Sequence, residues 1–162
     1  MTDELVRDCR PQSNGDLVRS LAGFPAEVER ALDGRPREDL LKPASDGGWG
    51  VVENLCHLRD WEEVFLHRLH QVLKEDHPVL PVYDDELWAI ERDYRGEDPT
   101  KVFEQFRATR KELVSQLEGL DDDGWNRTGQ HQSRGDVSVR WLAESVLDHG
   151  ETHLAQIHDA LG

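Results

Sequence analysis

The sequence has few cysteines and no long apolar run. Its two cysteines, Cys9 and Cys56, lie in dissimilar surroundings within 162 residues, so we expect no disulfide framework. No apolar segment approaches the roughly 20 residues that a membrane-spanning helix needs. The opening Met-Thr-Asp-Glu does not resemble a secretory signal. These absences predict a cytoplasmic protein.

Basic side chains are also scarce. The chain has 19 Lys and Arg against 34 Asp and Glu, which gives a formal net charge of -15. Such a surface repels phosphate groups, so neither nucleic acid nor an anionic membrane is expected as a partner. Hydrophobic residues still make up 36% of the chain, enough for one folded domain. We predict a single domain over residues 15–162 after an irregular lead-in over residues 1–14. The expected partner is a small-molecule substrate.

Apolar residues recur at helical spacing in four long segments. These segments cover residues 17–32, 49–74, 100–117 and about 138–157. Pro25 interrupts the first, so either one helix kinks there or two shorter helices meet. The pattern predicts an all-α fold built on four helices.

Two connections between these segments are long. Residues 75–98 contain a short amphipathic stretch, residues 84–94, which predicts an extra short helix between the second and third long helices. Residues 120–136 carry three glycines and are expected to form a loop. The sequence shows no convincing strand. The length of the first connection leaves the topology of the bundle open.

A pair of histidines near the C-terminus has the spacing of a metal site. His149 and His153 are four residues apart, so on a helix both imidazoles lie on one face, about 6 Å apart along the axis. Two such rings can bind one divalent ion. His57, on the second long helix, is the best candidate for a third ligand, because His67 and His70 lie at least two and a half turns further along.

The spacing of the histidines leaves two questions open: whether it marks a site at all, and which metal such a site would bind. A pair at this spacing arises by chance in a chain with eight histidines, and it can lie half exposed on an amphipathic helix. If a metal does bind, imidazole accepts zinc, nickel, iron, manganese and copper, and spacing does not choose among them.

Three stretches together resemble the DinB/YfiT-like superfamily. They read GWGVVENLCHL at residues 48–58, VRWL at 139–142 and HGETHLAQI at 149–157. The resemblance spans residues 17–161 and implies a four-helix bundle of the DinB/YfiT-like type. It also implies that His57, His149 and His153 bind a divalent metal, often zinc or nickel, with iron or manganese as other candidates. A homodimer is a further expectation from it.

The resemblance suggests an enzyme. Members include transferases that use a low-molecular-weight thiol, such as mycothiol or bacillithiol, and metal-dependent hydrolases. The metal would lower the pKa of a bound thiol or water. Asp60 and Glu53 share a helix face with His57, so either could orient a ligand or accept a proton as a catalytic residue. The alternative is a non-catalytic, stress-related bundle whose metal is structural or sensing.

Three further residues lie in or between these motifs. Gly150 costs about 1 kcal/mol against alanine in a helix, and it would allow close helix packing or substrate approach. Cys56 points about 100° away from His57, which is typical of a small core residue rather than a fourth ligand. His131, on the glycine-rich loop, is expected to face solvent, with a role in the pocket as the alternative.

Overall fold

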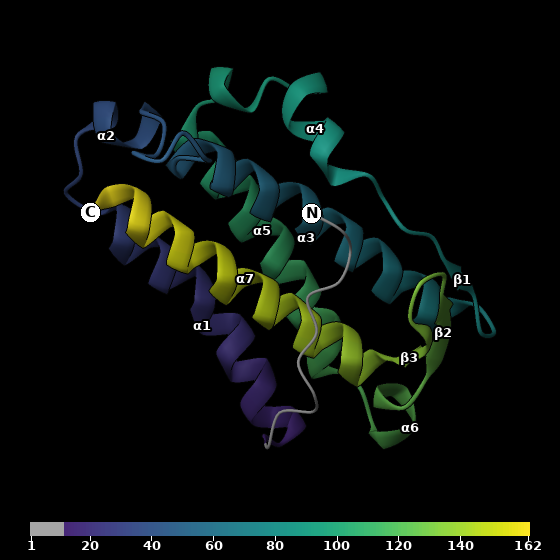
Figure 1. Ribbon diagram of the computed structural model, residues 1–162. Helices are drawn as coiled ribbons and strands as arrows, with labels where there is room; N and C mark the ends of the chain where they lie inside the picture. The colour runs from purple at the N-terminus through teal and green to yellow at the C-terminus, as the bar shows by residue number, and fades with distance from the viewer. Residues whose placement is uncertain (1–11) are drawn as a thin grey trace.

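Four long helices form the body of the molecule in the computed structural model, which describes residues 12–162 (Figure 1). They are α1 (Asn14–Leu32), α3 (Val51–Lys74), α5 (Pro99–Glu118) and α7 (Val139–Leu161). Helices α1 and α3 each pack against both α5 and α7. The predicted all-α four-helix bundle is therefore confirmed. The predicted lead-in and Cys9 fall largely or wholly outside the described residues.

Helix α1 runs without interruption through Pro25, so it is one helix rather than two. Proline has no N–H, and the carbonyl of Leu21, four residues earlier, therefore loses its usual helical donor. Arg110 of α5 supplies a replacement, because its guanidinium donates to the Leu21 oxygen at 3.1 Å. The same guanidinium forms a buried ion pair with Glu62 of α3. A single arginine thus ties three helices together.

The long connection after α3 carries the predicted extra helix. Helix α4 (Asp85–Glu91) and a 3-10 turn, η1 (Tyr94–Gly96), lie along the outside of α3 in Figure 1. Another short helix, α2 (Arg37–Leu41), precedes α3. Figure 1 shows α2 near the end of the bundle where α7 terminates. These short elements surround one end of the α3–α7 pair.

A small sheet at the opposite end of α7 corrects the expectation that the chain has no strands. It consists of β1 (Val79–Leu80), β2 (Thr128–His131) and β3 (Gly135–Ser138). A short helix, α6 (Asp122–Trp125), precedes β2. Strand β2 pairs parallel with β1 and antiparallel with β3. Strands of two to four residues are too short to show an alternating pattern, and they form because the two connections between long helices meet here.

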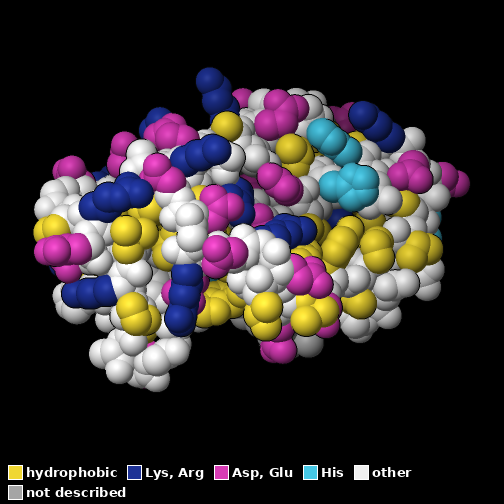
Figure 2. Space-filling view, turned by 90° about the horizontal axis from the view of Figure 1, so that it is seen from above, with side chains coloured by type: hydrophobic (Ala, Val, Ile, Leu, Met, Phe, Trp, Pro, Cys, Tyr) yellow, Lys and Arg dark blue, Asp and Glu magenta, His cyan; other side chains and the backbone are white. Residues whose placement is uncertain are grey.

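Within residues 12–162, no helix is both long enough and apolar enough to cross a bilayer. On the face seen in Figure 2, acidic and basic side chains are interspersed with hydrophobic ones. Most of the large apolar side chains are instead buried between the four long helices.

Candidate metal centre

Helices α3 and α7 bring three histidines together. His57 comes from α3, and His149 and His153 come from successive turns of α7. The centroids of the three rings lie 4.4–4.9 Å apart. One nitrogen from each ring can be chosen so that all three lie within 4.8 Å of one another. The predicted meeting of these residues is confirmed, and they are called the histidine cluster below.

The histidine cluster fits a divalent metal ion. Its members are 0–6% exposed, yet both ring nitrogens of His57 and the Nε2 atoms of His149 and His153 have no hydrogen-bond partner in the described part of the chain. Burying a polar atom without a partner costs free energy. Four-coordinate zinc, with bonds of about 2.0–2.1 Å, would hold such nitrogens about 3.3 Å apart. Small side-chain shifts therefore suffice to satisfy them with one ion.

Asn54 orients one ring of the cluster. Its side-chain oxygen lies 2.8 Å from Nδ1 of His153, and its amide nitrogen donates to the Gly50 carbonyl at 2.9 Å. Because the oxygen accepts, we assign the proton of His153 to Nδ1, which leaves the lone pair of Nε2 available to a metal. Sequence reasoning missed Asn54. An amide within the apolar stripe of α3, three residues before His57, is the signal that could have revealed it.

All three imidazoles are held in the neutral form that binds metals. Burial lowers the pKa of His57 to about 2 and that of His153 to about 4. Burial also holds the pKa of His149 well below its usual range, and the neighbouring rings add to the effect because two imidazolium charges would repel. A metal would not have to displace a proton from these rings at neutral pH.

Asp85 is the carboxylate that lies against the histidine cluster. Its Oδ2 atom is 3.8 Å from Nε2 of His57 and accepts a hydrogen bond from the indole of Trp61 at 2.9 Å. The residue is 1% exposed, and burial raises its pKa. Asp85 reaches this position from α4, which the sequence alone could not place.

The two carboxylates expected near the cluster make other contacts. Asp60 accepts from the hydroxyl of Tyr94 at 2.5 Å and pairs with two arginines, Arg59 at 3.0 Å and Arg92 at 2.8 Å. Glu53 accepts from the backbone N–H of Gly50 at the start of α3. Both share the helix with His57 but contribute to packing around η1 and to helix capping. Their expected role at the metal therefore receives no support from these contacts.

The outcomes for Cys56 and His131 differ. Cys56 is fully buried, and burial raises the pKa of its thiol to about 12, as expected of an unreactive core residue. The expectation that His131 faces solvent was wrong, because it is 1% exposed on β2 and packs 5.7 Å from the ring of Trp141. It lies in the small sheet and does not line the cleft described next.

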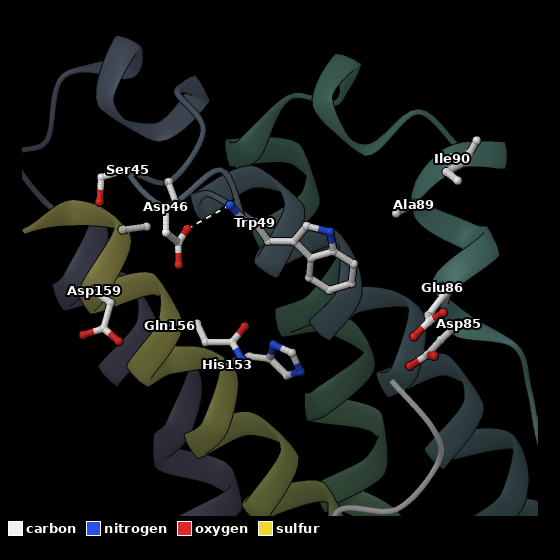
Figure 3. Close-up of a pocket in the computed structure, with 13 residues that line it drawn as sticks. Ser45, Asp46, Trp49, Asp85, Glu86, Ala89, Ile90, His153, Gln156 and Asp159 are labelled. Carbon is white, nitrogen blue, oxygen red and sulfur yellow. Dashed lines mark hydrogen bonds between the residues drawn. The ribbon is translucent and has the colours of Figure 1, made fainter.

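A cleft of about 720 Å³ opens beside the histidine cluster (Figure 3). Its walls come from the segment 44–49 before α3, from α4 and from the last turns of α7. His153 is the member of the cluster that lines it. In Figure 3 the indole of Trp49 lies above the space that separates His153 from the carboxylates of α4. A small molecule in this cleft would therefore have access to the cluster through His153.

Comparison with known proteins agrees with this architecture. The solved structure of YfiT from Bacillus subtilis, described as "a probable metal-dependent hydrolase with an unusual four-helix bundle topology", superimposes with a TM-score of 0.86 and 21% identity. The match covers 96% of this chain and 91% of that one. At this identity the likeness shows the fold alone.

Sequence relatives carry a common name. A protein of Oceanobacillus iheyensis named "Putative metal-dependent hydrolase" is 28% identical over 90% of this chain and 84% of its own length. The Bacillus subtilis protein YfiT, which has the same name, is 24% identical over 86% of this chain and 79% of its own. The pattern that defines the DinB superfamily matches residues 21–157, which include every member of the histidine cluster. This chain belongs to the DinB superfamily.

Proposed function

We propose that this protein is a metal-dependent enzyme whose divalent ion is held by His57, His149 and His153. The observation that carries the proposal is the cluster of three buried imidazoles with unpartnered nitrogens. When bound, the ion would supply the Lewis acidity that lowers the pKa of a water or a low-molecular-weight thiol. The names of the relatives favour hydrolysis, and thiol transfer is the second candidate reaction.

The ligand set favours a catalytic ion over a structural one. Structural zinc sites are usually closed by four protein donors, whereas catalytic sites keep a position open. Among the described residues the cluster contains three donors, and the adjoining cleft gives a substrate access to His153. Asp85 lies against the cluster, with 3.8 Å between its Oδ2 atom and Nε2 of His57. It is therefore the residue that we propose for orienting a ligand at the open position, in place of Asp60 or Glu53.

The non-catalytic alternative rests on a different observation. The rings of the cluster are almost fully buried, which also suits a metal that stabilises the bundle or senses its availability. An exchangeable water on the bound ion distinguishes the two, because a closed site has none. Zinc and nickel are the first metals to test, followed by iron(II) and manganese(II).

Metal analysis of protein purified without a nickel column tests the proposal directly. We expect about one divalent ion per chain, and loss of that ion in His57→Ala and His153→Ala with helix content retained by circular dichroism. His67→Ala is the matched control, because His67 lies on the same helix α3 but is exposed. Metal contents that are equal in all four proteins would contradict the proposal.

Self-association and location stay predictions. The resemblance to the superfamily suggests a homodimer, and the cytoplasm is the expected compartment. Several large apolar side chains on or beside α4 are exposed, among them Val82, Leu87 and Ile90, and a second subunit could cover them. Sedimentation equilibrium would measure the mass of the assembly.

A further inference from the structure

The charged side chains that line the cleft are all acidic. Four carboxylates face it, from Asp46 before α3, Asp85 and Glu86 on α4, and Asp159 on α7. Among residues 12–162, no lysine or arginine lines it. Three of these carboxylates, those of Asp46, Glu86 and Asp159, are exposed. Like charges gathered in a cleft with low-dielectric walls focus a negative potential within it.

An aromatic surface accompanies these charges. Trp49 lies in the cleft, and its ring centroid is 6.4 Å from that of His153 and 4.9 Å from that of His57. Figure 3 shows Asp46 and the α4 carboxylates on different sides of this indole. The face of a tryptophan attracts organic cations, with a free energy of about 0.5–2 kcal/mol depending on desolvation. Apolar contacts with Ala89 and Ile90 are available on the α4 side.

One buried side chain that lines the cleft also has a polar atom without a partner. His153 is fully buried, it lines the cleft, and its Nε2 has no hydrogen-bond partner in the described part of the chain. This atom belongs to the histidine cluster, so the cleft leads to the proposed metal. A molecule that fills the cleft would place one end at the cluster and the other among the carboxylates.

We propose that the substrate of this site carries a positively charged amino group, which binds among Asp46, Glu86, Asp159 and the face of Trp49 while the reacting group lies at the histidine cluster. This inference rests on the proposed function. It narrows the substrate class to organic amines, and it disfavours substrates and thiol cofactors that carry a net negative charge. A divalent ion with three neutral imidazoles contributes two positive charges, and the three exposed carboxylates of the cleft outnumber them.

Three hydroxamic acids of matched size test the inference on zinc-loaded protein. Hydroxamates bind zinc directly, and the far end can be an ammonium (β-alanine hydroxamate), a methyl group (butyrohydroxamate) or a carboxylate (succinic monohydroxamate). Calorimetry should show the ammonium compound binding about tenfold more tightly than the methyl compound, and the carboxylate compound about tenfold more weakly. The preference should shrink as salt is added.

Single neutralising variants locate the effect. Asp46→Asn, Glu86→Gln and Asp159→Asn should each reduce the ammonium preference about threefold and leave the affinity for butyrohydroxamate unchanged. Asparagine at position 46 keeps the oxygen that accepts from the N–H of Gly48. Glu118→Gln is the matched control, because it removes one charge at the opposite end of the bundle, where α5 ends near α6 (Figure 1). Asp85 is left intact because it lies against His57.

The outcomes separate the inference from the proposed function. Equal affinities for the three compounds would overturn the inference while zinc binding stands. So would an ammonium preference that is the same in the three cleft variants as in Glu118→Gln. Binding of none of the compounds to zinc-loaded protein would overturn the inference and favour a closed, structural ion. Failure to bind zinc at all would remove the proposed function and the inference with it.

Discussion

The side-chain oxygen of Asn54 lies 2.8 Å from Nδ1 of His153, and both residues are fully buried. The contact fixes the ring so that Nε2 faces the histidine cluster. Partners of this kind around metal-binding histidines typically contribute 10–100-fold to metal affinity. We therefore expect Asn54→Ala to weaken zinc binding by about that factor, measured by competition with a chromophoric chelator.

The exposed residue Asn126 supplies the control for this experiment. Asn126→Ala should leave zinc affinity unchanged. Because Asn54 also bonds the backbone at the start of α3, unfolding should be followed in parallel. Unaltered zinc affinity in folded Asn54→Ala would show that the contact does not position the ligand.

Acid should destabilise the metal-free protein through the histidine cluster. Burial lowers the pKa of His57 to about 2 and of His153 to about 4, whereas an unfolded chain has ordinary values near 6.5. Below about pH 6.5 the unfolded state therefore binds more protons than the folded state. As the pH is lowered below about 6.5, the free energy of unfolding should decrease by about 1.4 kcal/mol per pH unit for each buried histidine. For His153 the decrease should end near pH 4.

Urea unfolding between pH 7.5 and 5.5 measures this slope. His153→Gln should reduce it, and His67→Gln should not, since His67 is exposed. Excess zinc should raise the free energy of unfolding near pH 7, where the neutral rings bind the ion. A stability that does not change over this range would mean that the three rings are not neutral and buried in the metal-free protein.

Gly150 is required by the packing of α7 on α1. A Cβ at this position would lie 2.9 Å from the ring of Phe24, which is fully buried and packs edge-on against Phe106. Overpacking in Gly150→Ala should cost about 1–3 kcal/mol, which cancels or exceeds the roughly 1 kcal/mol that alanine gains in a helix, so the substitution should not stabilise the protein. Chemical denaturation measures the difference.

Gly23 offers the matched control on α1. A Cβ there would meet nothing within 4 Å, so Gly23→Ala should stabilise the protein by up to about 1 kcal/mol. Stabilisation by both substitutions would contradict the packing argument. The alternative that Gly150 serves substrate approach predicts instead a loss of activity without a loss of stability.

The buried pair of Arg110 and Glu62 should be sensitive to the loss of either partner. The two residues are 2–3% exposed, and a second contact between them measures 3.0 Å. Glu62→Ala leaves the arginine buried without its counter-charge and should cost about 3–5 kcal/mol. Glu104→Ala removes the partner of Arg107 in an exposed pair and should cost at most about 1 kcal/mol. Equal costs would show that Glu62 does not compensate a buried charge.

Local periodicity determined the four long helices and the alignment of His149 with His153. A helix repeats every 3.6 residues whatever it packs against, so apolar spacing located α3, α5 and α7 to within a few residues. The same regularity placed both histidines on one face of α7. The choice of His57 as their partner also followed from its position on the predicted second helix and from the resemblance to the superfamily.

Tertiary structure alone decided which groups surround those histidines. Asn54 meets His153 across α3 and α7, and Asp85 arrives on α4, whereas Asp60 faces the arginines around η1. Strands β1 and β2 pair although 48 residues lie between their first residues, Val79 and Thr128. Contacts between elements depend on how helices pack and where connections lead, and residue spacing within one element carries no information about either.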